Sequence, residues 1–164
     1  MTRATAAVPL ALLTTVFVFF DRLAVGQESK SLAKDSELLM SGRWQGTWLS
    51  LSSKSSGYVY SADLQVKVQV DGAVEGKINW TVKKAPLGSS LAPKVGRSAV
   101  EFVKGKFDPA SRTLSLAGYK KDDPQGLIGL DRYRLILADN DIVLGGITSS
   151  QDTWQGLLSL SLKK

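Results

Sequence analysis

Glu101 is the strongest candidate for a chemically active side chain in this sequence of 164 residues. It lies in an alternating run in which Lys104 and Lys106 mark one face of a strand as water-facing, so Glu101 shares the opposite, apolar face. A carboxyl group in an apolar interior has a raised pKa unless a cation or a hydrogen-bond donor pairs with it, and it can act as an acid, a base or a ligand anchor. The opposite orientation, with Val100 and Phe102 facing inward, stays open from the sequence alone.

A second group of charged residues interrupts an otherwise apolar run further along the chain. Alternation places Asp131 and Tyr133 on one face, and Arg132 and Arg134 on the other. Whichever face is internal therefore brings at least one charged group inside, and an unpaired buried charge is very costly. We expect a buried ion pair, either between Glu101 and one of the two arginines or between Asp131 and a Lys or Arg.

Aromatic side chains are the other candidates for ligand contacts. The four tryptophans either line a cavity or fill the core. Tyr58 and Tyr60 follow the Ser/Gly-rich segment 51–57, which is typical of a loop at the mouth of a barrel. The candidate ligand-binding residues are Tyr58, Tyr60, Trp48, Glu101, Tyr133 and Arg134.

Composition excludes several kinds of chemistry. The chain has no Cys and no His, which rules out disulfides, thiolate nucleophiles, Cys/His zinc sites and His-based triads. We found no Gly-x-Ser-x-Gly elbow, P-loop or dinucleotide fingerprint. The segment 139–141 starts like a calcium loop but lacks the Gly and Glu that complete one. We therefore expect no catalytic residue, no metal site and no cofactor.

The net charge of +6 comes partly from basic residues around the segment 83–106. Such a cluster can meet anionic glycans, lipid headgroups or nucleic acid. Because no nucleic-acid motif accompanies it, we expect solvated lysines and no nucleic-acid partner.

The first 26 residues have the pattern of a secretory signal peptide. Arg3 precedes an apolar stretch of 15 residues, and small residues at Ala24 and Gly26 fit cleavage before Gln27. The stretch is shorter than the roughly 20 residues that a spanning helix needs, although a retained anchor is the alternative. We expect a secreted or periplasmic protein with no membrane span after cleavage, a flexible leader at 27–41 and one domain at 42–164. The oligomeric state stays open.

Period-two hydrophobicity dominates the chain beyond residue 41. Two alternating runs, 64–70 and 74–82, flank Asp71-Gly72, which predicts a β-hairpin with a type I′ turn. Six more strands are predicted at 43–51, 98–107, 112–119, 127–137, 142–149 and 153–162. Eight strands with mostly short connections fit an up-and-down barrel or a two-sheet sandwich. We predict an all-β, eight-stranded antiparallel up-and-down barrel, because closure removes exposed sheet edges.

The tripeptide Gly42-Arg43-Trp44 resembles the Gly-x-Trp sequence that opens the first strand of lipocalins and avidins, the calycin group of small barrels. The resemblance implies that Trp44 packs at the closed base of the barrel beneath an arginine from a late strand, here Arg132 or Arg134. The lipocalin cysteines and the Thr-Asp-Tyr motif are absent, and no biotin site can be matched residue by residue.

Three functional hypotheses follow from these observations. The first is an exported binding module for a small apolar molecule, a glycan or a peptide, held at the open end near Tyr58, Tyr60 and the connection 83–96. The second is a calycin-type isomerase or cyclase that polarises its substrate with Glu101, Tyr133 or Arg134. The third is an accessory protein of the cell envelope that binds another protein through an exposed apolar face.

Overall fold

The computed structural model describes residues 40–51, 56–150 and 154–164. All of these residues belong to one compact unit, Ala33–Lys164. The predicted signal peptide at 1–26 and most of the predicted leader at 27–41 lie outside the described residues. Among the described residues, no helix is both long and apolar enough to span a membrane.

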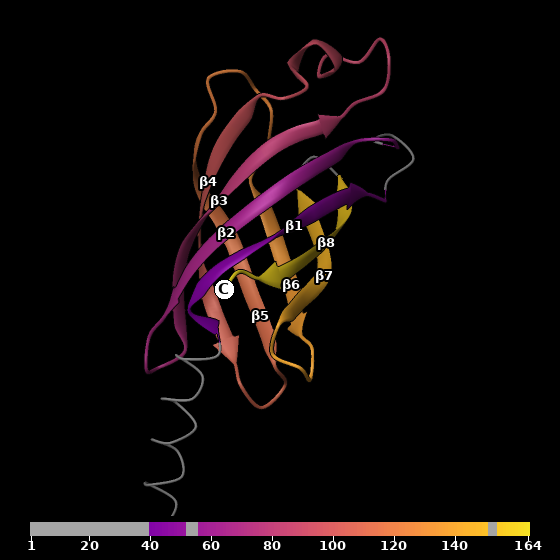
Figure 1. The fold of residues 1–164 in the computed structure, drawn as a ribbon. Coiled ribbons are helices and arrows are strands. Elements are labelled where there is room, and N and C mark those ends of the chain that lie inside the picture. The colour runs from indigo at the N-terminus through magenta and orange to yellow at the C-terminus, as the bar shows by residue number, and fades with distance from the viewer. Residues whose placement is uncertain (1–39, 52–55, 151–153) are drawn as a thin grey trace, which may run out of the picture. The chain divides into compact units, whose positions relative to one another are not determined.

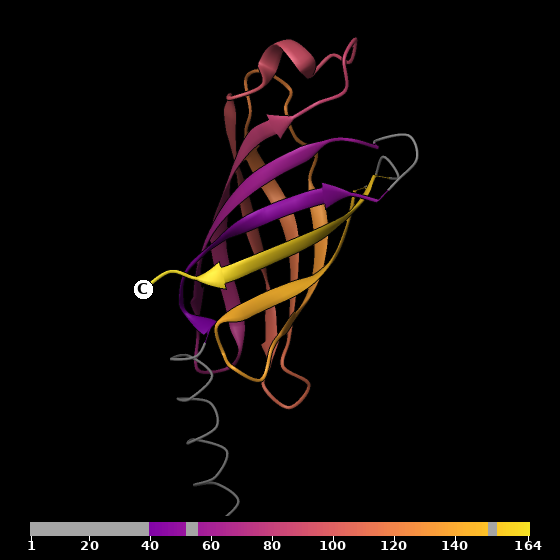
Figure 2. The ribbon, with the colours of Figure 1, turned by 45° about the vertical axis from the view of Figure 1, so that its right-hand side comes forward.

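Eight antiparallel strands form a closed barrel in which each strand pairs with its neighbours in the chain and β1 also pairs with β8 (Figures 1 and 2). This confirms the prediction of an all-β up-and-down barrel. The strands are β1 (Gly42–Ser50), β2 (Val59–Val68), β3 (Ala73–Lys84), β4 (Ser98–Asp108), β5 (Thr113–Asp122), β6 (Asp131–Leu137), β7 (Val143–Ser150) and β8 (Gln155–Leu162). A short 3-10 helix, η2 (Ala92–Lys94), lies in the long connection between β3 and β4.

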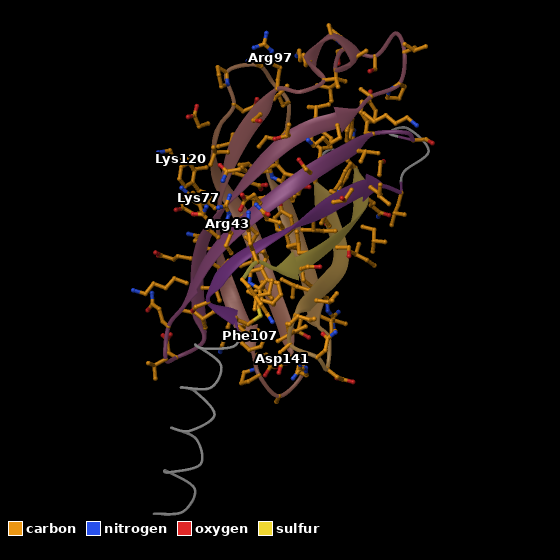
Figure 3. The ribbon with its side chains drawn as sticks, in the orientation of Figure 1. Arg43, Lys77, Arg97, Phe107, Lys120 and Asp141 are labelled. Carbon is orange, nitrogen blue, oxygen red and sulfur yellow. The ribbon has the colours of Figure 1, made fainter. Side chains whose placement is uncertain are left out.

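Alternation along each strand separates a dry interior from a wet exterior. In β2, for example, Leu64, Val66 and Val68 are buried, whereas Lys67 between them is exposed. Figure 3 shows Lys77 and Lys120 pointing away from the barrel. Burial of one apolar side chain is worth about 1.5–3 kcal/mol, and this stabilisation fixes the register because a slip of one residue would turn every side chain to the wrong face.

The base of the barrel, where β1 begins and β8 ends, is sealed by Met40 and Trp44. Both are fully buried, and the Trp44 Nε1–H donates to the Met40 carbonyl oxygen at 3.1 Å. The prediction that an arginine from a late strand covers this indole was wrong, because Arg132 and Arg134 are exposed on the outer face of β6. Ser41 adds a further contact, since its Oγ accepts a hydrogen bond from the Val68 amide at 3.0 Å.

The β2–β3 turn forms where Asp71-Gly72 predicts it, but it is not of type I′. Gly72 has φ 81°, whereas the non-glycine residues with positive φ in the described part of the chain are Arg112 and Asp141. Asp71 therefore lacks the left-handed conformation that a type I′ turn requires. The Gly72 amide donates to the Gln69 carbonyl at 2.9 Å, which fits a three-residue turn that ends on a left-handed glycine.

Strands β5 and β6 differ from their predicted bounds at the open end. β5 extends to Asp122, and β6 begins at Asp131 instead of at residue 127. The reason is a competing set of hydrogen bonds: the Asp123 carboxylate accepts from the amides of Leu127 at 2.8 Å and Ile128 at 3.0 Å. Because these amides bond to the Asp123 side chain, residues 123–130 form a loop over the end of the barrel instead of extending the β5–β6 ladder.

A β-bulge in the β4–β5 pair changes which side chains face the interior. Phe102 pairs with Lys120 and Val103 pairs with Gly118, so Tyr119 has no direct partner in the ladder. The bulge reverses the alternation beyond Gly118. Lys121 consequently lies opposite Glu101 in the β4–β5 ladder, and its side chain is on the same face of the sheet as that of Glu101 at the open end.

Candidate functional site

A cavity of about 390 Å³ lies at the open end of the barrel, opposite the base. The connections β3–β4 and β5–β6 gather at this end, where Figure 3 also places Arg97, whereas Phe107 and Asp141 lie at the base. Four aromatic side chains line the cavity together with three charged ones and three apolar residues of the connections. The aromatic residues are Trp48, Tyr60, Trp80 and Trp154; the charged ones are Glu101, Lys121 and Asp131; the apolar ones are Leu91, Leu127 and Ile128.

Glu101 lies deep in this cavity and is only 1 % exposed. Its Oε1 accepts a hydrogen bond from the Asp131 amide at 2.9 Å, and its Oε2 accepts one from Trp80 Nε1 at 3.0 Å and one from the Tyr133 hydroxyl. Gly118 leaves room for the carboxylate, because a Cβ at that position would lie 1.9 Å from Oε1. The inward orientation that alternation predicts is therefore present, and three donors hold the carboxylate in one place.

Burial and hydrogen bonding act on Glu101 in opposite directions. Burial raises its pKa above the usual value, while the bonds from Asp131, Tyr133 and Trp80 and the charge of Lys121 partly offset that rise. Tyr133 is affected in the same environment: burial, followed by the adjacent Glu101 charge, raises the pKa of its hydroxyl well above the usual value. Tyr133 thus stays protonated and serves as a hydrogen-bond donor to Glu101.

The aromatic walls are fixed by contacts within the protein. Tyr60 lies edge-on to both Trp48 and Trp80, with ring centroids 5.5 and 6.2 Å apart. Trp48 Nε1 donates to Thr148 Oγ1 at 2.7 Å, and the Tyr60 hydroxyl donates to the Leu127 carbonyl at 2.8 Å. This part of the cavity is accordingly preformed, because the rings of Trp48, Tyr60 and Trp80 cannot turn without breaking hydrogen bonds.

Gly156 is a further requirement for this arrangement. The Trp48 indole lies directly against it, so a Cβ at position 156 would fall 2.0 Å from Trp48 Nε1. Only glycine leaves space for the indole at this position of β8.

The mouth of the cavity is bordered by a second aromatic pair and by the β5–β6 loop. Tyr58 packs against Trp154 with ring centroids 5.1 Å apart. Across the mouth, Lys121 Nζ donates to the Ile128 carbonyl and lies 3.5 Å from the Asp123 carboxylate. The positive charge of Lys121 is thus already paired at the rim.

The six residues predicted as a site do not all come together. Trp48, Tyr60 and Glu101 line the cavity. Tyr133 is not among the lining residues, but its hydroxyl donates a hydrogen bond to Glu101. Tyr58 lies at the mouth and is half-buried. Arg134 is exposed on the outside of the barrel, where it borders a separate hollow with Lys106 and Ser115.

The predicted buried ion pair between Glu101 and Arg134 or Arg132 was wrong. The alternation of β6 turns Asp131 and Tyr133 inward, so both arginines face water. Neutral donors replace the expected cation at the Glu101 carboxylate. The isomerase hypothesis asks Arg134 to converge with Glu101 and Tyr133, and the outward position of Arg134 prevents this.

Sequence reasoning missed the part of the cavity that the loops and the bulge supply. Leu91, Leu127 and Ile128 come from connections whose path over the barrel has no periodic signal. Lys121 is turned toward the cavity by the bulge, for which Gly118 is the only local hint. Within the described residues, no group of three or more Asp or Glu side chains could hold a metal ion.

No family model, curated protein or solved structure matches this chain. The closed eight-stranded barrel is compatible with a calycin-like fold. Its function must therefore be argued from the cavity itself.

Proposed function

We propose that this protein is a binding module that takes one small organic molecule into the cavity at the open end of its barrel. The observation that carries the proposal is the preformed space of about 390 Å³ with four aromatic side chains around a buried carboxylate. Ligand sites in proteins are typically concave, mostly apolar, and furnished with a few fixed polar groups.

The rigidity of the walls supports this proposal. Trp48, Tyr60 and Trp80 are each held by a hydrogen bond to another part of the barrel, so a ligand does not have to order them on binding. A preorganised site of this kind loses less conformational entropy when it binds a ligand, which favours affinity.

Binding of the neutral fluorescent probe N-phenyl-1-naphthylamine tests the proposal. We expect saturable binding of one probe per chain, with enhanced probe emission. The variant Ser90→Trp places a bulky side chain at the cavity wall and should abolish binding, whereas Ser159→Trp on the outer face of β8 should leave it unchanged. Equal binding by both variants, or no binding by the unaltered protein, would contradict the proposal.

We also propose that the protein is exported and that the binding module acts outside the cytoplasm, in a periplasm or in the medium. The support is the signal-peptide pattern of residues 1–26. Mass spectrometry of the protein recovered from the producing cells tests it. A chain that begins at Gln27 is the expected result, and a cytoplasmic chain that retains residues 1–26 would contradict export.

A further inference from the structure

We propose that the cavity selects a small organic cation, an ammonium group carried on an aromatic or aliphatic body. This inference rests on the proposed binding function and adds the chemical class of the ligand. Three features support it: the donors of three wall rings are already used, the Glu101 carboxylate can accept a further hydrogen bond, and aromatic rings line the same space.

The hydrogen-bond donors of three aromatic side chains in the cavity wall, Trp48, Tyr60 and Trp80, are directed at protein atoms. Trp48 Nε1 is bound to Thr148, and the Tyr60 hydroxyl is bound to the Leu127 carbonyl. Trp80 Nε1 and the Tyr133 hydroxyl are both bound to Glu101. A ligand therefore meets the faces and edges of these rings and not their donor groups, which disfavours a ligand that needs donors, such as a carboxylate or a phosphate.

The Glu101 carboxylate brings negative charge into the cavity, and no cation is hydrogen-bonded to it in the described structure. Lys121 is the single cation among the described lining residues. Lys121 is paired at the rim with the Asp123 carboxylate and the Ile128 carbonyl. The hydrogen-bond donors of Glu101 are all neutral, and Lys121, whose charge also acts on Glu101, is itself bonded at the rim.

The Glu101 carboxylate can accept another hydrogen bond. A carboxylate oxygen accepts about two hydrogen bonds, and Oε1 accepts one, from the Asp131 amide, in the described structure. An ammonium group of a ligand can supply the second bond and the missing positive charge together. Hydrogen bonds between an ionised donor and an ionised acceptor are stronger than neutral ones, particularly away from water.

The surrounding rings have the composition of a site for organic ammonium groups. Trp48, Tyr60, Trp80 and Trp154 line the same space as Glu101. The negative faces of aromatic rings attract cations, and tryptophan does so best, which is why cages of aromatic residues bind quaternary ammonium ligands. Carboxylate and rings thus favour the same kind of ligand.

Three matched compounds test the charge preference on the unaltered protein: 2-phenylethylamine, 2-phenylethanol and 3-phenylpropanoate, each competed against N-phenyl-1-naphthylamine at neutral pH. We expect the amine to displace the probe at concentrations about tenfold lower than the alcohol, and the carboxylate to be the weakest competitor. Equal or tighter binding of the alcohol or the carboxylate would overturn the inference while the cavity proposal stands. If neither the probe nor any compound binds, the proposed function fails and the inference fails with it.

A pair of variants then locates the effect. Glu101→Gln keeps the shape of the side chain and removes its charge, so we expect the advantage of the amine over the alcohol to fall about tenfold. Glu75→Gln removes an exposed charge from the outer face of β3 and should leave the advantage unchanged. An undiminished advantage in folded Glu101→Gln would overturn the role of Glu101. Should that variant not fold, the comparison of the three compounds on the unaltered protein still decides the charge preference.

Discussion

Replacing Tyr133 by Phe removes one hydroxyl group from the hydrogen-bond cluster around Glu101 and leaves the ring in place. Tyr133 is 3 % exposed and its hydroxyl donates to Glu101 Oε2. The bonds from Trp80 and from the Asp131 amide remain in the variant. The substitution therefore tests a single interaction with a buried carboxylate.

The expected loss follows from the charge of the acceptor. A hydrogen bond to an ionised group contributes about 1.5–3 kcal/mol to stability, and one between neutral groups about 0.5–1.5 kcal/mol. We expect the Tyr133→Phe variant to lose about 1.5–3 kcal/mol in its free energy of unfolding where Glu101 is ionised, and less where Glu101 is protonated.

The dependence on pH has a definite sign. Burial raises the pKa of Glu101 in the folded state, so the folded protein binds this proton more readily than the unfolded chain. The contribution of Glu101 to stability is complete below the ordinary Glu pKa and is lost as the pH rises through the raised value. The Tyr133 hydroxyl opposes the rise, so its removal raises the pKa of Glu101 further and makes the loss of stability grow from about pH 4 toward neutral pH.

Urea unfolding at several pH values, followed by tryptophan fluorescence, measures this effect. Tyr119→Phe is the matched control, because Tyr119 is 51 % exposed on the outer face and keeps its ring contact with Lys104. On a Glu101→Gln background, the loss caused by Tyr133→Phe should shrink to that of a neutral bond. A loss of the same size at every pH, or one undiminished on that background, would refute the reasoning.

Three further substitutions test other parts of the barrel. Gly156→Ala should cost about 1–3 kcal/mol and weaken probe binding, because the new Cβ would fall 2.0 Å from Trp48 Nε1; an unchanged near-UV circular dichroism spectrum would contradict this. Gly72→Ala should destabilise the protein more than Gly88→Ala in urea unfolding, because both have φ near 80° but only the former brings its Cβ within 2.8 Å of a carbonyl oxygen. Asp141→Asn, which removes a partly exposed ion pair, should cost less than about 1 kcal/mol and lose its effect in high salt.

Most of the fold could be predicted because its information is local. The alternation of Leu64, Val66 and Val68 with polar residues defines one strand without reference to any other. The turn at Asp71-Gly72 was also predictable in position, although not in type. The inward orientation of Glu101 follows from the same alternation, since Lys104 lies on the other face.

The partners of Glu101 could not be predicted, because they depend on which face of β6 is internal. The sequence of β6 is polar on both faces near Asp131, and alternation alone does not choose between Tyr133 and Arg134. Leu135 and Leu137, further along the strand, are buried, and Tyr133 lies on the same face of β6 and therefore also points into the barrel. Loop contacts are less predictable still, since the path of residues 123–130 is set by the Asp123 carboxylate.

The pairing of the first strand with the last has a consequence for folding order and for chain rearrangement. Every other pairing joins consecutive strands, whereas β1 and β8 can meet only after the whole sheet has curled round. Contacts between distant parts of a chain form slowly, so ring closure is expected to be the late step of folding. The Lys163 amide donates to the Arg43 carbonyl at 2.8 Å, which shows how close the start of β1 lies to the end of β8. A circular permutant could join the end of β8 to the start of β1 and begin and end at the turn around Pro109, between β4 and β5. It would keep every strand pairing, make β8 and β1 a hairpin, and leave the β4–β5 pairing as the contact that closes the barrel.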